Sequence, residues 1–267
     1  MNKKIAYAIP NLFTAGSLIC ALIALNQIVD GYFIQAAWLV TLSLILDGFD
    51  GRMARMLNAT SRIGAQADSL ADFVAFGIVP GFLAWQMSLK YFGFLGFIVF
   101  VIYVLCGGFR LARFNVVNIS ITNKNDFMGL PIPAAAAAIC SFILFKMLVL
   151  SQHSSYASIN ESLHFLLLLV IISMSYLMVS KIPYIAVNKQ QKKKKYISLI
   201  LIFVTILAVA IIGYTVWVYF VCVWLYIFYG IFNKTMMSIY KYQEKHLYKK
   251  NIIPFVPNKR KRKVDKL

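Results

Sequence analysis

The sequence predicts an all-α protein, a polytopic transmembrane helical bundle of about eight spans with both termini in the cytoplasm. Hydrophobic residues make up 61% of the 267 residues and charged residues only 13%, against about 45–50% and about 25% in soluble domains. The apolar residues form separate runs of about 20 residues, the length needed to cross a bilayer. The 27 Lys and Arg residues outnumber nine Asp and Glu residues, for a net charge of +18. This composition excludes a soluble domain and a disordered chain.

The expected spans follow the apolar runs in order. They lie at residues 11–29, 33–53, 67–88, 91–112, 131–150, 163–181, 197–212 and 214–232. The first run is too long for the core of a signal peptide, so we expect an uncleaved span. Two prolines, Pro131 and Pro133, open the fifth span, a common place for proline in a helix. The last two spans share one apolar run, which we divide at Gly213; a re-entrant pair is the alternative.

The basic residues support this count and orientation. With the N-terminus inside and eight spans, only Lys90 and Lys146 fall on the outer side, as the preference of Lys and Arg for cytoplasmic loops requires. We therefore expect residues 1–233 to form a membrane-embedded domain and residues 234–267 a basic cytoplasmic tail. Basic runs of this kind bind anionic membrane lipid, and no specific nucleic-acid partner is expected.

The cysteines and histidines indicate no further site. The four cysteines are isolated within apolar stretches, which is typical of buried hydrophobic side chains and not of disulfides or zinc sites. The three histidines do not cluster, and we expect His153 and His164 at the membrane surface near the outer loop.

Four of the nine acids fall between positions 47 and 72, at the inner ends of the second and third spans. Asp47 and Asp50 are separated by one helical turn and share a face, and Asp68 and Asp72 share a face of the next helix. The short connection between the two helices lets them lie antiparallel, so the four carboxylates can converge. Carboxylates near a membrane are costly and repel one another unless a cation is present. Divalent cations prefer oxygen ligands, and a pair of metal ions is a known device for displacement at phosphorus.

The alternative is that these acids form interfacial ion pairs with nearby arginines. That interpretation suits a single acid better than four acids at helical spacing with glycines on the same faces. The spacing of the acids therefore favours a metal site.

The acid-rich window also resembles the signature of the CDP-alcohol phosphotransferase family. The pattern D-x2-D-G-x2-A-R-x8-G-x3-D-x3-D is matched without a gap by Asp47, Asp50, Gly51, Ala54, Arg55, Gly64, Asp68 and Asp72. The resemblance implies a membrane enzyme that transfers a substituted phosphate from a CDP-linked donor to an alcohol and releases CMP.

The same resemblance implies roles for these residues. Asp47, Asp50, Asp68 and Asp72 would ligate Mg²⁺ or Mn²⁺, with two ions expected, and Asp72 would also act as the catalytic base on the acceptor hydroxyl. The CDP donor would contact four further residues, namely Gly51, Ala54, Arg55 and Gly64.

Three other stretches resemble the bacterial phosphatidylserine synthase branch of this family. They are residues 9–17 (IPNLFTAGS), 108–115 (GFRLARFN) and 129–137 (GLPIPAAAA). Ile132 departs from the small hydroxylic residue expected between the two prolines. Arg110 and Arg113, which share a helix face on the acid side, are candidates for binding the acceptor carboxylate.

The expected reaction is therefore transfer of the phosphatidyl group from CDP-diacylglycerol to L-serine at the cytoplasmic face of a bacterial inner membrane. Glycerol 3-phosphate or inositol as acceptor is the alternative within the family. A transporter with an acidic ion site and a non-catalytic basic adaptor are alternatives from other classes. A homodimer is expected by analogy with the family.

Overall fold

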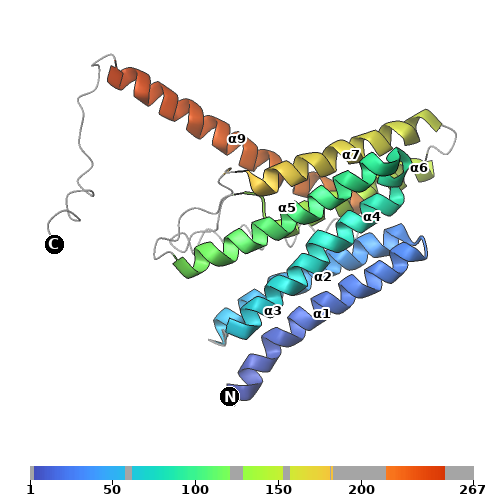
Figure 1. Cartoon of the computed structure of the whole chain (residues 1–267), viewed down its shortest axis with the longest axis horizontal. Helices are drawn as coiled ribbons and strands as arrows, with labels where there is room; N and C mark the ends of the chain where they lie inside the picture. Colours follow the sequence, from blue (N-terminus) through green and yellow to red (C-terminus); the bar gives the residue numbers. More distant parts are fainter. Residues whose placement is uncertain are drawn as a thin grey trace.

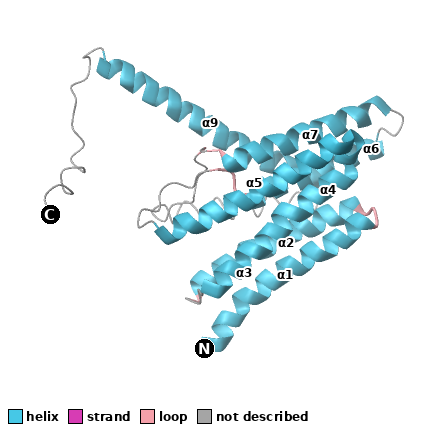
Figure 2. Cartoon of the chain, in the orientation of Figure 1, coloured by secondary structure: helices cyan, strands magenta, loops and turns pink. Residues whose placement is uncertain are grey.

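The computed structural model describes residues 3–57, 62–120, 129–152, 157–180, 182 and 215–249, and every regular element in these ranges is helical (Figure 2). The long helices are α1 (Lys3–Val29), α2 (Phe33–Met56), α3 (Arg62–Asp72), α4 (Val79–Met87), α5 (Gly93–Ser120), α6 (Ile132–Gln152), α7 (Ala157–Val179) and α9 (Thr215–Lys249). A π-helical turn, η1 (Phe73–Ile78), joins α3 to α4, and a 3-10 turn, η2 (Leu89–Phe92), follows α4.

Seven helical stretches within the described residues are long and apolar enough to cross a membrane. They correspond to the first six expected spans and the eighth, so the prediction of an all-α transmembrane bundle is confirmed. The third span covers α3, η1 and α4 as one stretch, Ile63–Met87. The expected span 197–212 lies outside the described residues.

Small side chains hold the first two helices together. α1 and α2 run antiparallel along each other (Figure 1), joined by a turn in which Gly31 has a φ of 82°. Ala21, Ala24, Ala36 and Ala37 are fully buried, which allows the close backbone approach typical of helix pairs in membranes. A buried pair of hydroxyl groups, Ser17 and Ser43, with oxygens 2.7 Å apart, links the two helices near their middle.

α6 is the most buried of the long helices and packs against α2, α4, α7 and α9. The segment that leads into α6 is held by backbone hydrogen bonds, because the N–H groups of Gly129 and Leu130 donate to the carbonyl oxygens of Ile182 and Leu177. Gly129 has a φ of 91°, and a Cβ there would collide with the carbonyl oxygen of Met178. Glycine is therefore required at this position.

Ile132, which departs from the resemblance, is fully buried in the first turn of α6. Its Cδ1 atom faces two glycines, at 2.8 Å and 3.5 Å from the positions that a Cβ would take at Gly107 and Gly77. The large side chain thus fills a groove that glycines on two neighbouring elements leave open.

The expectation that His164 lies at the membrane surface is wrong. His164 is 7% exposed and Lys146 only 1% exposed, because the two side chains and Ser88 form a hydrogen-bonded cluster between α4, α6 and α7. Lys146 Nζ lies 3.0 Å from both Ser88 Oγ and His164 Nδ1, and Ser88 Oγ lies 2.8 Å from His164 Nδ1. Burial against other polar groups satisfies hydrogen-bonding atoms that would otherwise need water.

α9 continues without interruption from the expected eighth span into the beginning of the basic tail. It ends at Lys249, beyond the expected boundary at residue 233, and its second half extends away from the other helices (Figure 1).

Candidate active site

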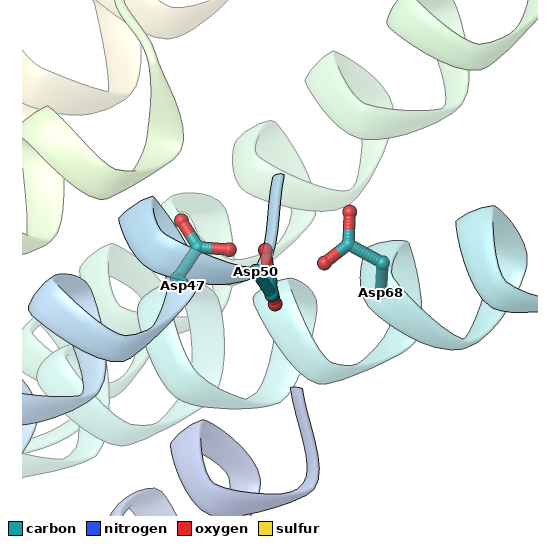
Figure 3. A group of neighbouring side chains, drawn as sticks. All are labelled: Asp47, Asp50 and Asp68. Atoms are coloured by element: carbon teal, nitrogen blue, oxygen red, sulfur yellow. The ribbon is translucent and has the colours of Figure 1, made fainter. Parts of the chain in front are cut away.

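Three carboxylates from two helices meet at one end of the bundle. Asp47 and Asp50 lie on α2 and Asp68 lies on α3, and one oxygen from each is within 4.8 Å of the others. Figure 3 shows Asp47 and Asp68 on opposite sides of Asp50. A spacing of this kind can place three oxygens around one cation.

The helical register explains this convergence. Asp47 and Asp50 are one turn apart near the end of the second span, and Asp68 lies early in the third. The chain reverses direction between them, so the three residues come to the same level of the bundle. The spacing of the acids in the sequence predicted this arrangement.

Asp72 joins the group through contacts with the other acids. Its side chain interacts with that of Asp47, and the side chains of Asp50 and Asp68 interact with each other. The four acids thus form one continuous group, although Asp72 is not one of the three whose oxygens lie within 4.8 Å of one another.

The donor atoms of this group fit a divalent cation. Asp68 Oδ1 is buried and has no hydrogen-bond partner among the described residues. Buried oxygens are nearly always paired, so an unpaired one beside two other carboxylates is a natural cation ligand. The carboxylate of Asp50, which is 5% exposed, is held from two sides: Thr14 Oγ1 donates to its Oδ2 over 2.9 Å, and the backbone N–H of Gly51 donates to it.

Of the two arginines expected to bind the acceptor, Arg110 interacts with one of the clustered acids. Arg110 lies on α5, and its guanidinium interacts electrostatically with Asp72 and with the Tyr226 hydroxyl of α9. It also lies 5.8 Å from the centroid of the Phe114 ring, a cation–π distance. Arg113 is half-buried on the same helix.

The end of the GFRLARFN stretch is attached to the acid-bearing helix. Asn115 on α5 exchanges hydrogen bonds with Ser69 on α3, at 3.2 Å and 3.3 Å. Ser69 directly follows Asp68, so this contact fixes the level of α5 relative to the acids.

The four expected donor-binding residues follow the acids on α2 and α3. Gly51 is exposed and Gly64 is half-buried, both at the acid end of the bundle. Ala54 and Arg55 belong to α2, and their side chains lie outside the described part of the structure.

Sequence reasoning missed the roles of Thr14 and of the Ser69–Asn115 pair. Thr14 lies in the stretch IPNLFTAGS, whose resemblance to a known branch was a signal that it could be functional. Nothing local in the sequence indicates that its hydroxyl reaches Asp50 on another helix.

Comparison with known proteins agrees with the resemblance of the acid-rich window. A protein of Helicobacter pylori (strain ATCC 700392 / 26695) named CDP-diacylglycerol–serine O-phosphatidyltransferase is 38% identical over 206 residues, which cover 76% of this chain and 82% of that protein. The protein of the same name from Bacillus subtilis (strain 168) is 35% identical over 176 residues, covering 66% of this chain and 89% of that protein. The family model described as CDP-alcohol phosphatidyltransferase matches residues 7–167. That range includes all four clustered acids and both arginines of α5, and the chain belongs to the CDP-alcohol phosphatidyltransferase family.

Proposed function

We propose that this protein transfers the phosphatidyl group of CDP-diacylglycerol to the hydroxyl of L-serine, forming phosphatidylserine and CMP. The observation that carries the proposal is the convergence of Asp47, Asp50 and Asp68 within 4.8 Å at the end of two apolar helices. The names of the relatives from Helicobacter pylori and Bacillus subtilis support serine as the acceptor.

A divalent cation, Mg²⁺ or Mn²⁺, would be held by Asp47, Asp50 and Asp68, and Asp72 would complete a second site beside them. Two such ions supply charge stabilisation at the diphosphate and at the departing phosphate. The unpaired Oδ1 of Asp68 and the Thr14 hydrogen bond to Asp50 support this assignment, since they leave carboxylate oxygens oriented and available.

The reaction needs two groups from the chain itself, a base and a group that binds the acceptor. Asp72 would accept the proton of the serine hydroxyl. The serine oxygen then forms a bond to the phosphorus that carries diacylglycerol, and the bond from that phosphorus to the bridging oxygen breaks, so that CMP leaves with the electron pair. Arg110, which interacts with Asp72, is placed to bind the serine carboxylate in a forked, charge-assisted contact.

The donor would approach from the bilayer. Gly51, Ala54, Arg55 and Gly64 would contact its CDP group while its acyl chains remain among the lipids. We place this site at the cytoplasmic face of a bacterial inner membrane, following the distribution of basic residues, and we expect a homodimer.

A transporter is the less suitable interpretation. Ion sites of transporters lie near the bilayer midplane, whereas Asp47 and Asp50 lie near the end of the span Phe33–Met53, and Asp68 lies near the beginning of Ile63–Met87.

The test is CMP release by the purified protein from CDP-diacylglycerol with Mn²⁺ or Mg²⁺. We expect release that depends on serine and is abolished by EDTA. CMP release that requires glycerol 3-phosphate or inositol would show that the protein uses another acceptor alcohol within the same family. Absence of release with all three alcohols would contradict the proposed activity.

A further inference from the structure

The helix that carries Asp68 and Asp72 changes its winding directly after Asp72. Residues Phe73–Ile78 form a π-helical turn, in which the N–H of Val79 bonds to the carbonyl of Val74, five residues earlier. A π turn adds one residue to the helix, and one residue corresponds to about 100° of rotation in an α-helix. The turn therefore sets which way the acids of α3 point relative to α4.

A single hydroxyl group supports this turn from another helix. Tyr103 on α5 is fully buried, and its hydroxyl donates to the Phe76 carbonyl over 2.9 Å. Phe76 lies in the middle of the π turn and is itself fully buried. A buried carbonyl needs a donor, and a π turn interrupts the regular helical pairing that would otherwise supply one.

The neighbouring surfaces fit the widened turn closely. A Cβ at Gly108 would lie 3.2 Å from the ring of Phe73, the first residue of the turn, and a Cβ at Gly77 would lie 3.2 Å from the same ring. The ring of Tyr103 in turn packs on Gly81, where a Cβ would lie 3.0 Å from Cδ1. α5 thus holds the turn by shape as well as by the hydrogen bond.

We infer that Tyr103 is a positioning residue of the active site: its hydroxyl holds the π turn after Asp72, so that Asp68 and Asp72 face Asp47 and Asp50. Tyr103 touches none of the acids. It acts through η1, because a turn relaxed to ordinary α-helical winding would rotate the acids of α3 away from those of α2. This inference rests on the proposed metal site.

The experiment is Mn²⁺ binding to purified Tyr103→Phe protein, measured by the loss of the free Mn²⁺ signal in electron paramagnetic resonance. Groups that orient metal ligands alter metal affinity by about 10–100-fold, so we expect the Kd for Mn²⁺ to rise about tenfold. We also expect kcat for CMP release to fall at saturating Mn²⁺, with the KM for CDP-diacylglycerol changed little, because the donor contacts are elsewhere.

Tyr219→Phe is the matched control. Tyr219 on α9 is also hydrogen-bonded across helices, to Thr41 at 3.3 Å, but its partner lies on α2 and not on η1. It should keep the wild-type Kd for Mn²⁺. Gly81→Ala is a milder second variant, because its methyl group displaces the Tyr103 ring while the hydroxyl remains, and we expect a rise of a few-fold in the same Kd.

The outcomes separate this inference from the proposal on which it rests. Wild-type protein that binds no Mn²⁺ would contradict the metal site and, with it, the role of Tyr103. Wild-type binding with an unchanged Kd in Tyr103→Phe, even at a lower melting temperature, would reduce Tyr103 to a stabilising residue and overturn the inference. If Tyr103→Phe does not fold, an unchanged Kd in Gly81→Ala overturns it equally.

Discussion

Asp68 differs from the other clustered acids in having one carboxylate oxygen, Oδ1, buried without a hydrogen-bond partner among the described residues. We expect Asp68→Asn to lower serine-dependent CMP release by at least about 100-fold, more than the loss of a supporting group, because an amide replaces an anionic ligand. The measurement is the initial rate at saturating Mn²⁺.

Asp30→Asn is the control for this change. Asp30 accepts a hydrogen bond from Asn26 at the opposite end of α1 and α2, so its replacement should leave the rate unchanged. Equal rates for Asp68→Asn and wild type would exclude Asp68 as a ligand.

The hydroxyl of Thr14 orients Asp50 from a neighbouring helix. We expect Thr14→Ala to weaken activation by Mn²⁺ about tenfold, the lower end of the range for groups that support a metal ligand. Thr14→Ser keeps the donor and should restore most of the affinity. The measurement is the Mn²⁺ concentration that gives half-maximal CMP release.

Thr41→Ala serves as a control for Thr14, since Thr41 bonds the Ala37 carbonyl and Tyr219 away from the acids. Weakening of the same size in Thr14→Ser would point to the missing methyl group and against the hydrogen bond.

At the level of elements, the sequence predicted which residues share one face of a single helix. Asp47 and Asp50 share a face of α2 by their spacing alone, and helical geometry is sufficient to predict that. The π turn after Asp72 could not be predicted in the same way, because the hydroxyl that supports it at Phe76 lies 27 residues further along the chain, on α5. The partner of Asp50 was missed for the same reason, since pairing between helices depends on their packing and relative level.

The burial of His164 could not be predicted from the pattern of residues within its own helix either. Its partners are Ser88, directly after α4, and Lys146 on α6. An isolated histidine near a loop is indistinguishable in sequence from one that completes such a cluster.

This buried cluster predicts a non-additive effect on stability. Lys146 keeps its ammonium group in the interior by donating to Ser88 and His164, and hydrogen bonds of charged groups contribute about 1.5–3 kcal/mol each. His164→Leu should therefore destabilise the protein by about 2 kcal/mol, because it leaves a buried charge with fewer partners. Lys146→Met removes the charge itself, and the double variant should recover most of the lost stability.

The measurement is a double-mutant cycle of thermal unfolding in detergent. Asp72 and Ser88 are separated by about 24 Å along the helix axis at about 1.5 Å per residue, so CMP release at low temperature should be unaffected in all three variants. If the losses of stability in the two single variants simply add in the double variant, Lys146 and His164 do not stabilise each other.

At the scale of the whole molecule, we expect the excess of basic residues to set the orientation of the protein in the membrane. The acid cluster occupies one end of the bundle, and the His164 cluster lies towards the other end, along the path from Asp72 to Ser88. If Lys and Arg mark the cytoplasmic side, the acids open to the compartment that supplies a water-soluble acceptor such as serine. The site would then also receive the donor from the adjoining lipid.

The orientation can be tested by cysteine labelling of intact cells with a membrane-impermeant maleimide, in a variant whose four natural cysteines are replaced. With the N-terminus inside, Asp30→Cys and Lys90→Cys should react in intact cells, because both residues are exposed at the outer ends of their helices. Met56→Cys, exposed at the acid end, should react only after lysis. The reverse labelling pattern would show that the active site faces the outside of the cell.

The tail decides between an even and an odd number of spans. Eight spans return the basic tail to the cytoplasm, so Lys250→Cys should react only after lysis, like Met56→Cys. A run 197–232 that crosses the membrane only once would place that cysteine outside, where it would react in intact cells. Such a result would leave the tail's many basic residues on the outer side, which is unfavourable for Lys and Arg. The labelling of this one position therefore tests the predicted orientation at the segment with the most basic residues.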